Sequence, residues 1–340
     1  MGRTPRFLGS RSLTIIVTGG AGFIGSNIVA GLAENGARVV VVDWLEDGDK
    51  WKNLARHFVH DLIRPDAFYP WLAREHASIK AVVHMGAISA TTERDGDKLV
   101  RENIRLTLDL WEWCARSEKP FIYASSAATY GDGSSGFDDD WSEAGLAKLV
   151  PLNGYGWSKH FVDRRISHDV ANGCAQPPKW AGLKFFNVYG PNEYHKGPMR
   201  SVVHQIYPGV VRGEAVPLFK SHRPEYSDGG QFRDFIYVKD CVAVVEWMLS
   251  HPFPSGIYNI GTGEARTWLD LATAVFAAAG RDANIEFIDT PIEIRDRYQY
   301  FTQANMQRLR TSGCGVKFHT LEDGIRDYVS GFLSKDNPFA

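Results

Sequence analysis

The chain has 340 residues, of which 44% are hydrophobic and 23% charged, values that exclude a disordered or collagen-like protein. Its 38 lysines and arginines nearly balance 40 aspartates and glutamates, so we expect no basic surface for nucleic acid. Four widely spaced cysteines give neither a CxxC motif nor a disulfide framework, which favours a reducing cytoplasm. No stretch is long enough to span a membrane, and residues 1–12 are predicted to be an N-terminal extension.

The first predicted unit is a strand, a glycine-rich turn, a helix and a second strand over residues 13–43. The apolar run 13–18 predicts a buried strand, the helix ends at Gly36, and residues 37–42 predict the next strand. The turn GGAGFIG has the spacing GxxGxxG, which lets the backbone and the helix N-terminus bind a pyrophosphate. Asp43 ends the second strand, where an acid meets an adenosine ribose. A plain tight turn is the alternative, but the flanking elements favour a dinucleotide site.

The alternation of apolar strands and helices continues. Further strands are predicted at 58–62, 80–84, 121–125 and 182–188, and helices at about 97–117 and 155–170. This pattern predicts a Rossmann-type, doubly wound parallel sheet. We place the dinucleotide-binding domain at residues 13–190, with segments near 233–262 returning to it, and a smaller C-terminal α/β substrate domain mainly at 191–335.

Tyr155 and Lys159 form a YxxxK pattern on the predicted helix, which places both side chains on one face. We expect the lysine to lower the pKa of the phenol, making Tyr155 an acid/base group for an alcohol. Ser126 follows a predicted strand, at the sheet edge where α/β proteins hold ligands. The alternatives are an exposed helix pair for the first two residues and a strand-end cap for Ser126.

The strings GGAGFIG, SSAATYG, YxxxK and FFNVYGP together resemble the extended short-chain dehydrogenase/reductase family of nucleotide-sugar enzymes, from about Thr14 to Phe332. The rarer strings ATTERDG, NVYGPNEYHKG, RDFIYVKD and RYQYFTQA resemble its ADP-heptose 6-epimerase branch. That resemblance implies epimerisation at carbon 6 of the heptose through a transient ketone, with bound NADP (NAD as the alternative), for lipopolysaccharide core synthesis. It also implies a homo-oligomer, a nucleotide-sugar substrate, and no metal.

The resemblance assigns roles to individual residues. It implies Ser126, Tyr155, Lys159 and, as a second acid/base group, Lys196 as the catalytic set. With the motif residues, it implies cofactor contacts at Gly19, Gly22, Phe23, Ile24, Gly25, Asp43, Trp44, Lys50, Asp61, Leu62, Met85, Gly86, Ala87, Ser89, Asn103, Tyr155, Lys159 and Val188. It implies substrate contacts at Ser126, Asn187, Lys196, Gln205, Phe219, Lys220, Ser221, His222, Arg233 and Tyr298.

Three other functions remain open at this stage. A 4-epimerase of UDP-hexoses shares the N-terminal motifs, although HKG and RYQYFTQA argue against it. A sugar 4,6-dehydratase needs an acid beside the strand-end serine, where Ala127 and Ala128 stand. A non-enzymatic, cofactor-sensing regulator would not need Tyr155 and Lys159. Gln205, at a position where the family pattern predicts histidine, puts fine substrate contacts in doubt.

Overall fold

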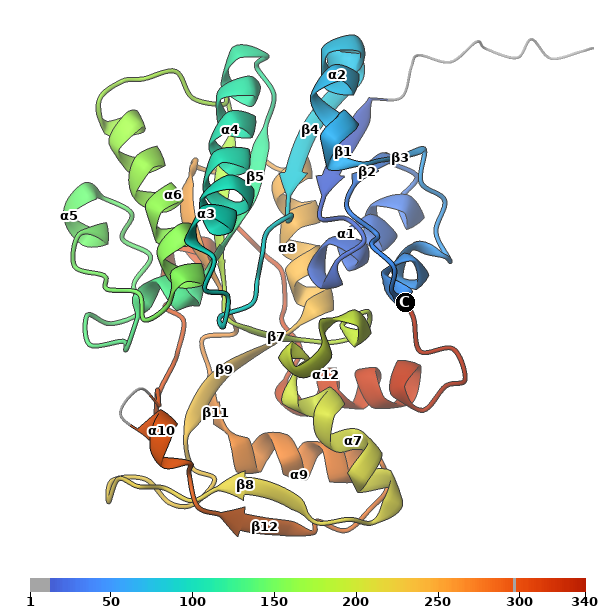
Figure 1. The fold of residues 1–340 in the computed structure, drawn as a ribbon, viewed down its shortest axis with the longest axis vertical. Coiled ribbons are helices and arrows are strands. Elements are labelled where there is room, and N and C mark those ends of the chain that lie inside the picture. The colour runs from blue at the N-terminus through green and yellow to red at the C-terminus, as the bar shows by residue number, and fades with distance from the viewer. Residues whose placement is uncertain (1–12, 296–297) are drawn as a thin grey trace, which may run out of the picture.

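The computed structural model describes residues 13–295 and 298–340, which form a large sheet with helices on both faces and a smaller α/β layer beside it (Figure 1). The predicted extension at residues 1–12 lies outside the described residues. The large sheet has seven parallel strands in the order β10-β6-β5-β4-β1-β2-β3. Their bounds are β1 (Thr14–Thr18), β2 (Arg38–Val42), β3 (Asp61–Ile63), β4 (Ile79–His84), β5 (Phe121–Ser126), β6 (Trp180–Phe185) and β10 (Gly256–Ile260). The predicted doubly wound fold is confirmed.

Side chains of successive strand residues enter two different cores, as the two-residue period of a strand requires. Ile15 and Val17 pack on the face covered by α1 and α8, whereas Ile16 packs on the face covered by α2, α4 and α6. The helices are α1 (Phe23–Glu34), α2 (Pro65–Glu75), α3 (Gly96–Leu99), α4 (Leu106–Arg116), α5 (Glu143–Leu146), α6 (Gly154–Ala171) and α8 (Val238–Ser250). Burial on both faces explains why the strands are continuous apolar runs.

Two predicted strands differ from the structure. The strand predicted at 58–62 exists but lies later in the chain: β3 spans Asp61–Ile63, and Phe58 is 83% exposed. The strand predicted at 182–188 is two strands, because the chain leaves the large sheet after Phe185 and pairs elsewhere from Asn187. The helix predicted at 97–117 contains a π-helical stretch, Val100–Arg105, between α3 and α4.

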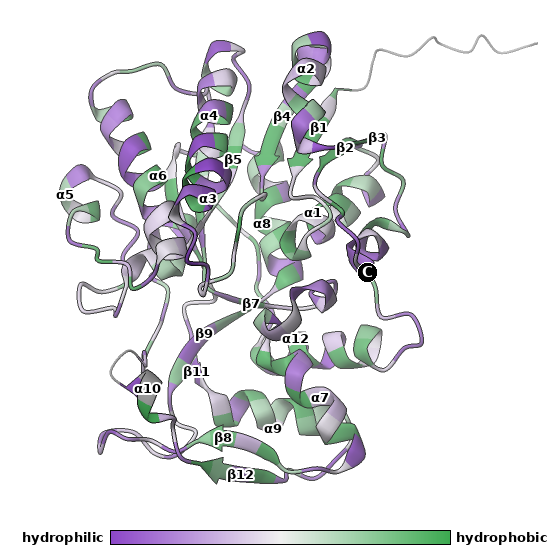
Figure 2. Ribbon diagram, viewed as in Figure 1, coloured by the Kyte–Doolittle hydropathy of each residue, from purple (hydrophilic) through white to green (hydrophobic). Residues whose placement is uncertain are grey.

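The smaller layer follows this exit. It contains the sheet β11-β9-β7 and the strand pair β12-β8, packed with helices whose apolar residues form a third core. Its elements are β7 (Asn187–Tyr189), α7 (Val202–Arg212), β8 (Val216–Phe219), β9 (Phe232–Tyr237), β11 (Ala265–Thr267), α9 (Trp268–Ala278), β12 (Ile285–Ile288), α10 (Ile292–Arg295) and α12 (Leu321–Tyr328). The remaining helix, α11 (Gln307–Thr311), packs against β10 of the large sheet. Figure 2 shows β8 and most of α8 in hydrophobic green and α3 in hydrophilic purple.

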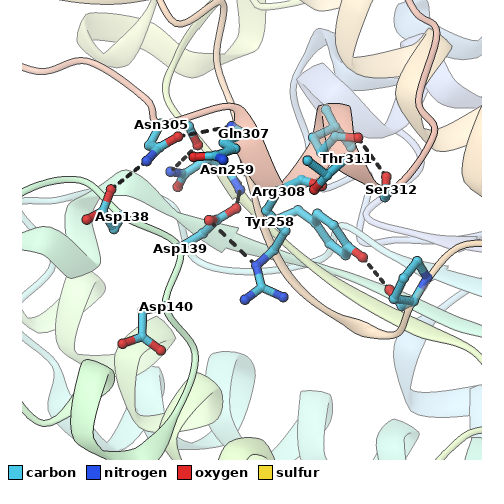
Figure 3. Close-up of polar contacts among 12 residues, drawn as sticks. Asp138, Asp139, Asp140, Tyr258, Asn259, Asn305, Gln307, Arg308, Thr311 and Ser312 are labelled. Carbon is cyan, nitrogen blue, oxygen red and sulfur yellow. Dashed lines mark hydrogen bonds and ion pairs between the residues drawn. The ribbon is translucent and has the colours of Figure 1, made fainter.

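The loop before α5 is tied to the C-terminal part of the chain (Figure 3). Asp139 is 7% exposed, accepts the backbone N–H of Asn259 at 3.0 Å, and lies 3.6 Å from the Arg308 guanidinium group. Asn305 donates to Asp138 at 2.7 Å. Burial raises the pKa of Asp139, and Arg308 acts in the opposite direction. These contacts fix a loop that the sequence alone marks only by its glycines and aspartates.

Candidate active site

The glycine-rich turn lies between β1 and α1, with no room for side chains at two of its glycines. A Cβ atom on Gly19 would lie 2.5 Å from the Gly86 nitrogen, and one on Gly25 would lie 2.0 Å from the Gly19 oxygen. Gly19 also has a φ of +65°, which favours glycine. Gly22 caps α1 without a side-chain hydrogen bond, so the backbone N–H groups of the first turn face the cleft. This turn fits the pyrophosphate of a dinucleotide.

Asp43 is fixed at the end of β2 by two donors. Its Oδ2 accepts the backbone N–H of Ala21 at 2.8 Å, and its Oδ1 accepts Lys50 Nζ at 2.6 Å. Lys50 also donates to the Trp44 carbonyl at 2.9 Å. Arg64, which the sequence analysis missed, lies with its guanidinium carbon 5.0 Å from the Trp44 ring centroid. Arg64 is also paired with Asp66 at 2.7 Å, so the ribose end of the site holds two cations, each paired with an aspartate.

Ser126, Tyr155 and Lys159 meet where β5 ends beside α6. Lys159 Nζ donates to the Ala124 carbonyl at 2.8 Å, and burial lowers the pKa of Lys159 to about 8 while Asp163 opposes the shift. Burial raises the pKa of Tyr155, and a hydrogen bond with Ser126 lowers it in part. The expectation that Lys159 lowers the pKa of Tyr155 is therefore wrong for the protein without bound cofactor. The ammonium group of Lys159 is hydrogen-bonded to the backbone, and the desolvation of Tyr155 dominates the shift of its pKa. Ser126 also accepts the Ala128 N–H at 3.1 Å, so the strand-end cap predicted as its alternative exists.

Lys196 reaches the same cleft from the turn Tyr194–Met199. Its Nζ lies 5.1 Å from the Phe23 ring centroid, at the glycine-rich turn. Burial lowers the pKa of Lys196, and Glu193 opposes that shift. His195, beside it, has a pKa lowered to about 4, first by burial and then by Lys50 and Lys196.

One cleft of about 310 Å³ brings most of the predicted residues together. Those predicted and found on its wall are Gly19, Gly22, Phe23, Ile24, Gly25, Asp43, Lys50, Met85, Gly86, Ala87, Ser89, Ser126, Tyr155, Lys159, Val188 and Lys196. The wall also has residues that the prediction lacked: Ala124, Ser125, Phe185, Phe186, His195 and Met199. Predicted cofactor residues that do not line it are Trp44, Asp61, Leu62 and Asn103.

Asn103 acts behind the wall. Its side chain is fully buried, exchanges hydrogen bonds with both backbone groups of Ile88, and donates to Ser158 at 2.9 Å. It thus joins the loop after β4 to α6. Asn53 was missed: its Nδ2 donates to the Ala21 carbonyl at 2.8 Å and lies 3.2 Å from His195 Nδ1. Only its place ten residues after Asp43 hinted at this link.

A second cavity of about 490 Å³ lies in the smaller layer, among α7, β8 and the start of α9. Predicted substrate residues Gln205, Phe219 and Tyr298 line it. Arg233 is 8% exposed, and its guanidinium carbon lies 5.6 Å from the Tyr298 ring centroid and 5.7 Å from that of Trp268. Among the described residues, no carboxylate lies within ion-pair distance of Arg233.

Four other predicted substrate residues do not line this second cavity. His222 Nδ1 lies 2.9 Å from the Tyr300 hydroxyl, and Ser221 Oγ lies 3.3 Å from it. Lys220 forms an ion pair with Asp289 at 3.2 Å, with both side chains largely exposed. Asn187 is exposed at the start of β7. Over 13–295 and 298–340, no cluster of histidine, cysteine, aspartate or glutamate could hold a metal ion, and no helix could cross a membrane.

The comparisons with known proteins fit this geometry. A model of the NAD dependent epimerase/dehydratase family matches residues 15–261. The chain belongs to this family. A relative from Nitratidesulfovibrio vulgaris (strain DP4), named ADP-L-glycero-D-manno-heptose-6-epimerase, is 50% identical over 333 residues, which cover 95% of this chain and 99% of the relative. The family resemblance inferred from the sequence is confirmed.

Solved structures of the family align over nearly the whole chain. The ADP-L-glycero-D-manno-heptose-6-epimerase of Helicobacter pylori has a TM-score of 0.78 and 28% identity, covering 97% of this chain and 100% of that one. The UDP-glucose 4-epimerase of Thermus thermophilus, in complex with NAD, has a TM-score of 0.73 and 27% identity. The alignment covers 95% of this chain and 99% of that one. Family membership makes the chain an epimerase-type enzyme that uses a nicotinamide nucleotide and implies a nucleotide-sugar substrate.

Proposed function

We propose that the chain is an ADP-heptose 6-epimerase, which interconverts the D-glycero and L-glycero forms of ADP-D-manno-heptose through a 6-keto intermediate. The observation that carries the proposal is that one cleft presents two separate acid/base groups, Tyr155 from α6 and Lys196 from the turn after β7. Two acid/base groups suit an inversion in which the ketone turns over, because each group can serve one orientation of the sugar. Relatives with this name support the choice of sugar.

The cofactor, bound along the glycine-rich turn, supplies a hydride acceptor and donor. Tyr155 then exchanges the proton of the substrate alcohol in one orientation of the sugar, with Ser126 hydrogen-bonded beside it. Lys159 contributes positive charge from its place on the Ala124 carbonyl. When the ketone has turned over, its oxygen faces Lys196, whose pKa is lowered by desolvation, which favours proton exchange.

We assign the nucleotide end of the substrate to the second cavity. Arg233 is a buried cation without a carboxylate partner among the described residues, and a guanidinium group binds diphosphate oxygens in a bidentate fork. Burial lowers the pKa of Arg233, and an arriving anion would compensate that desolvation. Phe219 and Tyr298 offer aromatic surfaces on which the adenine base of the nucleotide can stack. We place the boundary between cofactor and substrate domains near residue 190, with 233–262 returning to the first.

We propose NADP as the cofactor. Asp43 alone would repel a 2′-phosphate, but Lys50 Nζ lies 2.6 Å from the Asp43 carboxylate. Arg64 stacks on the Trp44 ring nearby. Two cations at the ribose end favour the extra phosphate. Lys50→Ala should reduce the ratio of NADP affinity to NAD affinity at least about tenfold, whereas Lys52→Ala, an exposed neighbour paired with Asp49, is the matched control. Equal ratios in both variants, measured by calorimetry, would assign the phosphate elsewhere.

The decisive experiment measures epimerisation of ADP-D-glycero-D-manno-heptose. Tyr155→Phe and Lys196→Met should each lose roughly 10²–10⁴-fold in kcat while folding and cofactor binding persist. Lys196→Arg keeps the charge but cannot act as a base, so it should stay nearly as slow as Lys196→Met. A near-normal rate for Lys196→Arg would remove the second acid/base role, and turnover of UDP-hexoses instead would change the substrate.

We further propose a homo-oligomer that works in the cytoplasm in lipopolysaccharide core synthesis. Trp157 and Phe161, on α6, are 43% and 41% exposed and give one face of the molecule an apolar character that supports self-association. Light scattering in solution tests the assembly, and a monomer at micromolar concentration would contradict it.

A further inference from the structure

Glu193 precedes the turn that carries Lys196, and its side chain is completely buried. Oε1 accepts the Ser201 hydroxyl at 2.6 Å and the Tyr328 hydroxyl at 3.0 Å, while Oε2 accepts the backbone N–H of Ser201. Among the described residues, no cation lies within ion-pair distance of this carboxylate. A buried glutamate without an ion pair is rare in proteins, so its retention here calls for a reason.

The bonds of Glu193 close a loop. Ser201 begins α7, so one carboxylate joins the residue before the turn to the residue after it. The backbone N–H of Lys196 donates to the Glu193 carbonyl at 3.0 Å, and Gly197, next to it, has a φ of +55°. Tyr328 anchors the assembly to the end of α12. The direction in which Lys196 leaves the backbone thus depends on Glu193.

We propose that Glu193 is the positioning residue of Lys196: it holds the Tyr194–Met199 turn in the shape that presents the lysine to the cleft, and its carboxylate supplies the negative charge that stabilises the lysine ammonium group. The proposal rests on the proposed role of Lys196 as the second acid/base group. Without a countercharge, the partial burial of that ammonium group on the Phe23 ring would shift its equilibrium towards the neutral amine.

The charged surroundings of Lys196 single out Glu193. Burial lowers the pKa of Lys196, and Glu193 is the carboxylate that raises it. Four other titratable groups lie near Glu193, namely Tyr194, His195, Arg200 and Tyr328. Asp43 and Lys50 lie beside His195. Tyr155 and Lys159 lie on the same cleft wall as Lys196. Asp43 is already bonded to Lys50, so its charge is compensated.

Glu193→Gln separates charge from geometry. The glutamine carbonyl can accept the Ser201 N–H, and its amide can donate to the two hydroxyl groups, which rotate to accept. The variant therefore keeps the closed loop and loses only the charge. Tyr328→Phe does the reverse, because it removes one bond to the carboxylate and leaves the charge. The matched controls are Asp240→Asn, a buried carboxylate paired with His319, and Tyr237→Phe, whose hydroxyl bonds Asp327 in the same core.

The first test measures the titration of Lys196 directly, by competitive acetylation across pH and mass spectrometry, in the full chain with NADP bound. We expect Glu193→Gln to lower the midpoint for Lys196 by about one pH unit, as for loss of a nearby opposite charge, and Asp240→Asn to leave it unchanged. The alkaline limb of the kcat profile should move by the same amount. An unchanged midpoint in Glu193→Gln would overturn the proposal.

The second test measures kcat at the optimum pH. Tyr328→Phe should lower kcat roughly threefold or more at unchanged Lys196 midpoint, as expected for one lost hydrogen bond, while Tyr237→Phe stays near wild type. Equal rates in these two variants would overturn the positioning role. Lys196→Met distinguishes failure of this proposal from failure of the proposed function. If Lys196→Met turns over substrate normally, the acid/base role of Lys196 fails. If Lys196→Met is inactive and Glu193→Gln leaves the Lys196 midpoint unchanged, only the positioning role of Glu193 is rejected.

Discussion

A buried ion pair behind the cleft offers the sharpest stability test. Lys184, on β6, is 1% exposed, and its Nζ lies 3.0 Å from Asp163 Oδ2, on α6, which is fully buried. Lys184 also donates to Thr129 at 2.6 Å. Asp163 accepts the hydroxyls of Ser125 at 2.7 Å and Tyr123 at 3.0 Å. These bonds join α6 to two central strands directly behind Tyr155 and Lys159.

Lys184→Met keeps most of the side-chain volume but removes the charge. It leaves the Asp163 carboxylate buried with only hydroxyl donors, and removal of one partner of a buried pair costs about 3–5 kcal/mol. We expect the free energy of unfolding to fall by that amount in urea titrations at pH 7. The control Lys239→Met breaks an ion pair with Asp327 whose side chains are 45% and 40% exposed, and it should cost less than about 1 kcal/mol.

The double variant tests the physical reason. Lys184→Met with Asp163→Asn removes both charges of the pair, and asparagine can still accept the two hydroxyls. It should therefore be more stable than Lys184→Met alone by about 1 kcal/mol or more. A cost below about 1 kcal/mol for Lys184→Met, or costs that simply add in the double variant, would refute the argument that an uncompensated charge causes the loss.

Three further outcomes are expected. Gly25→Ala should abolish NADP binding, measured by calorimetry, since its Cβ would lie 2.0 Å from the Gly19 oxygen. Burial lowers the pKa of His84 to about 3, so below about pH 6.5 the unfolded chain binds a proton at His84 that the folded chain does not. The free energy of unfolding therefore falls as the pH falls. His84→Gln should reduce this pH dependence by up to about 1.4 kcal/mol per pH unit, measured by urea unfolding at pH 5.0 and 7.5. Arg308→Met should destabilise the fold and expose the loop with Asp139 to proteolysis, measured against Arg310→Met, whose side chain forms no ion pair in the described residues.

The cofactor half of the site could be predicted from the sequence because its signals are local. The glycine spacing, Asp43 and the YxxxK pair each lie within one strand–turn–helix unit, and the periodicity of that unit fixes where the side chains go. The end of β6 could not be predicted in the same way. Residues 182–188 are apolar throughout most of their length, and whether such a run stays in one sheet depends on which strands it meets, here β9 after Phe185.

The polar framework behind the site needs information of another kind. Glu193 and Tyr328 lie 135 residues apart, and Asp163 and Lys184 face each other only because α6 packs across β6. In the sequence each of these residues is indistinguishable from a solvated surface residue, which is the commoner fate of Lys, Glu and Asp. Burial of such groups requires hydrogen-bond partners from distant segments, and those partners form only once the sheet is assembled. The local motifs therefore identify Tyr155 and Lys159 as candidate catalytic residues, whereas the orientation and charge of these side chains are properties of the complete fold.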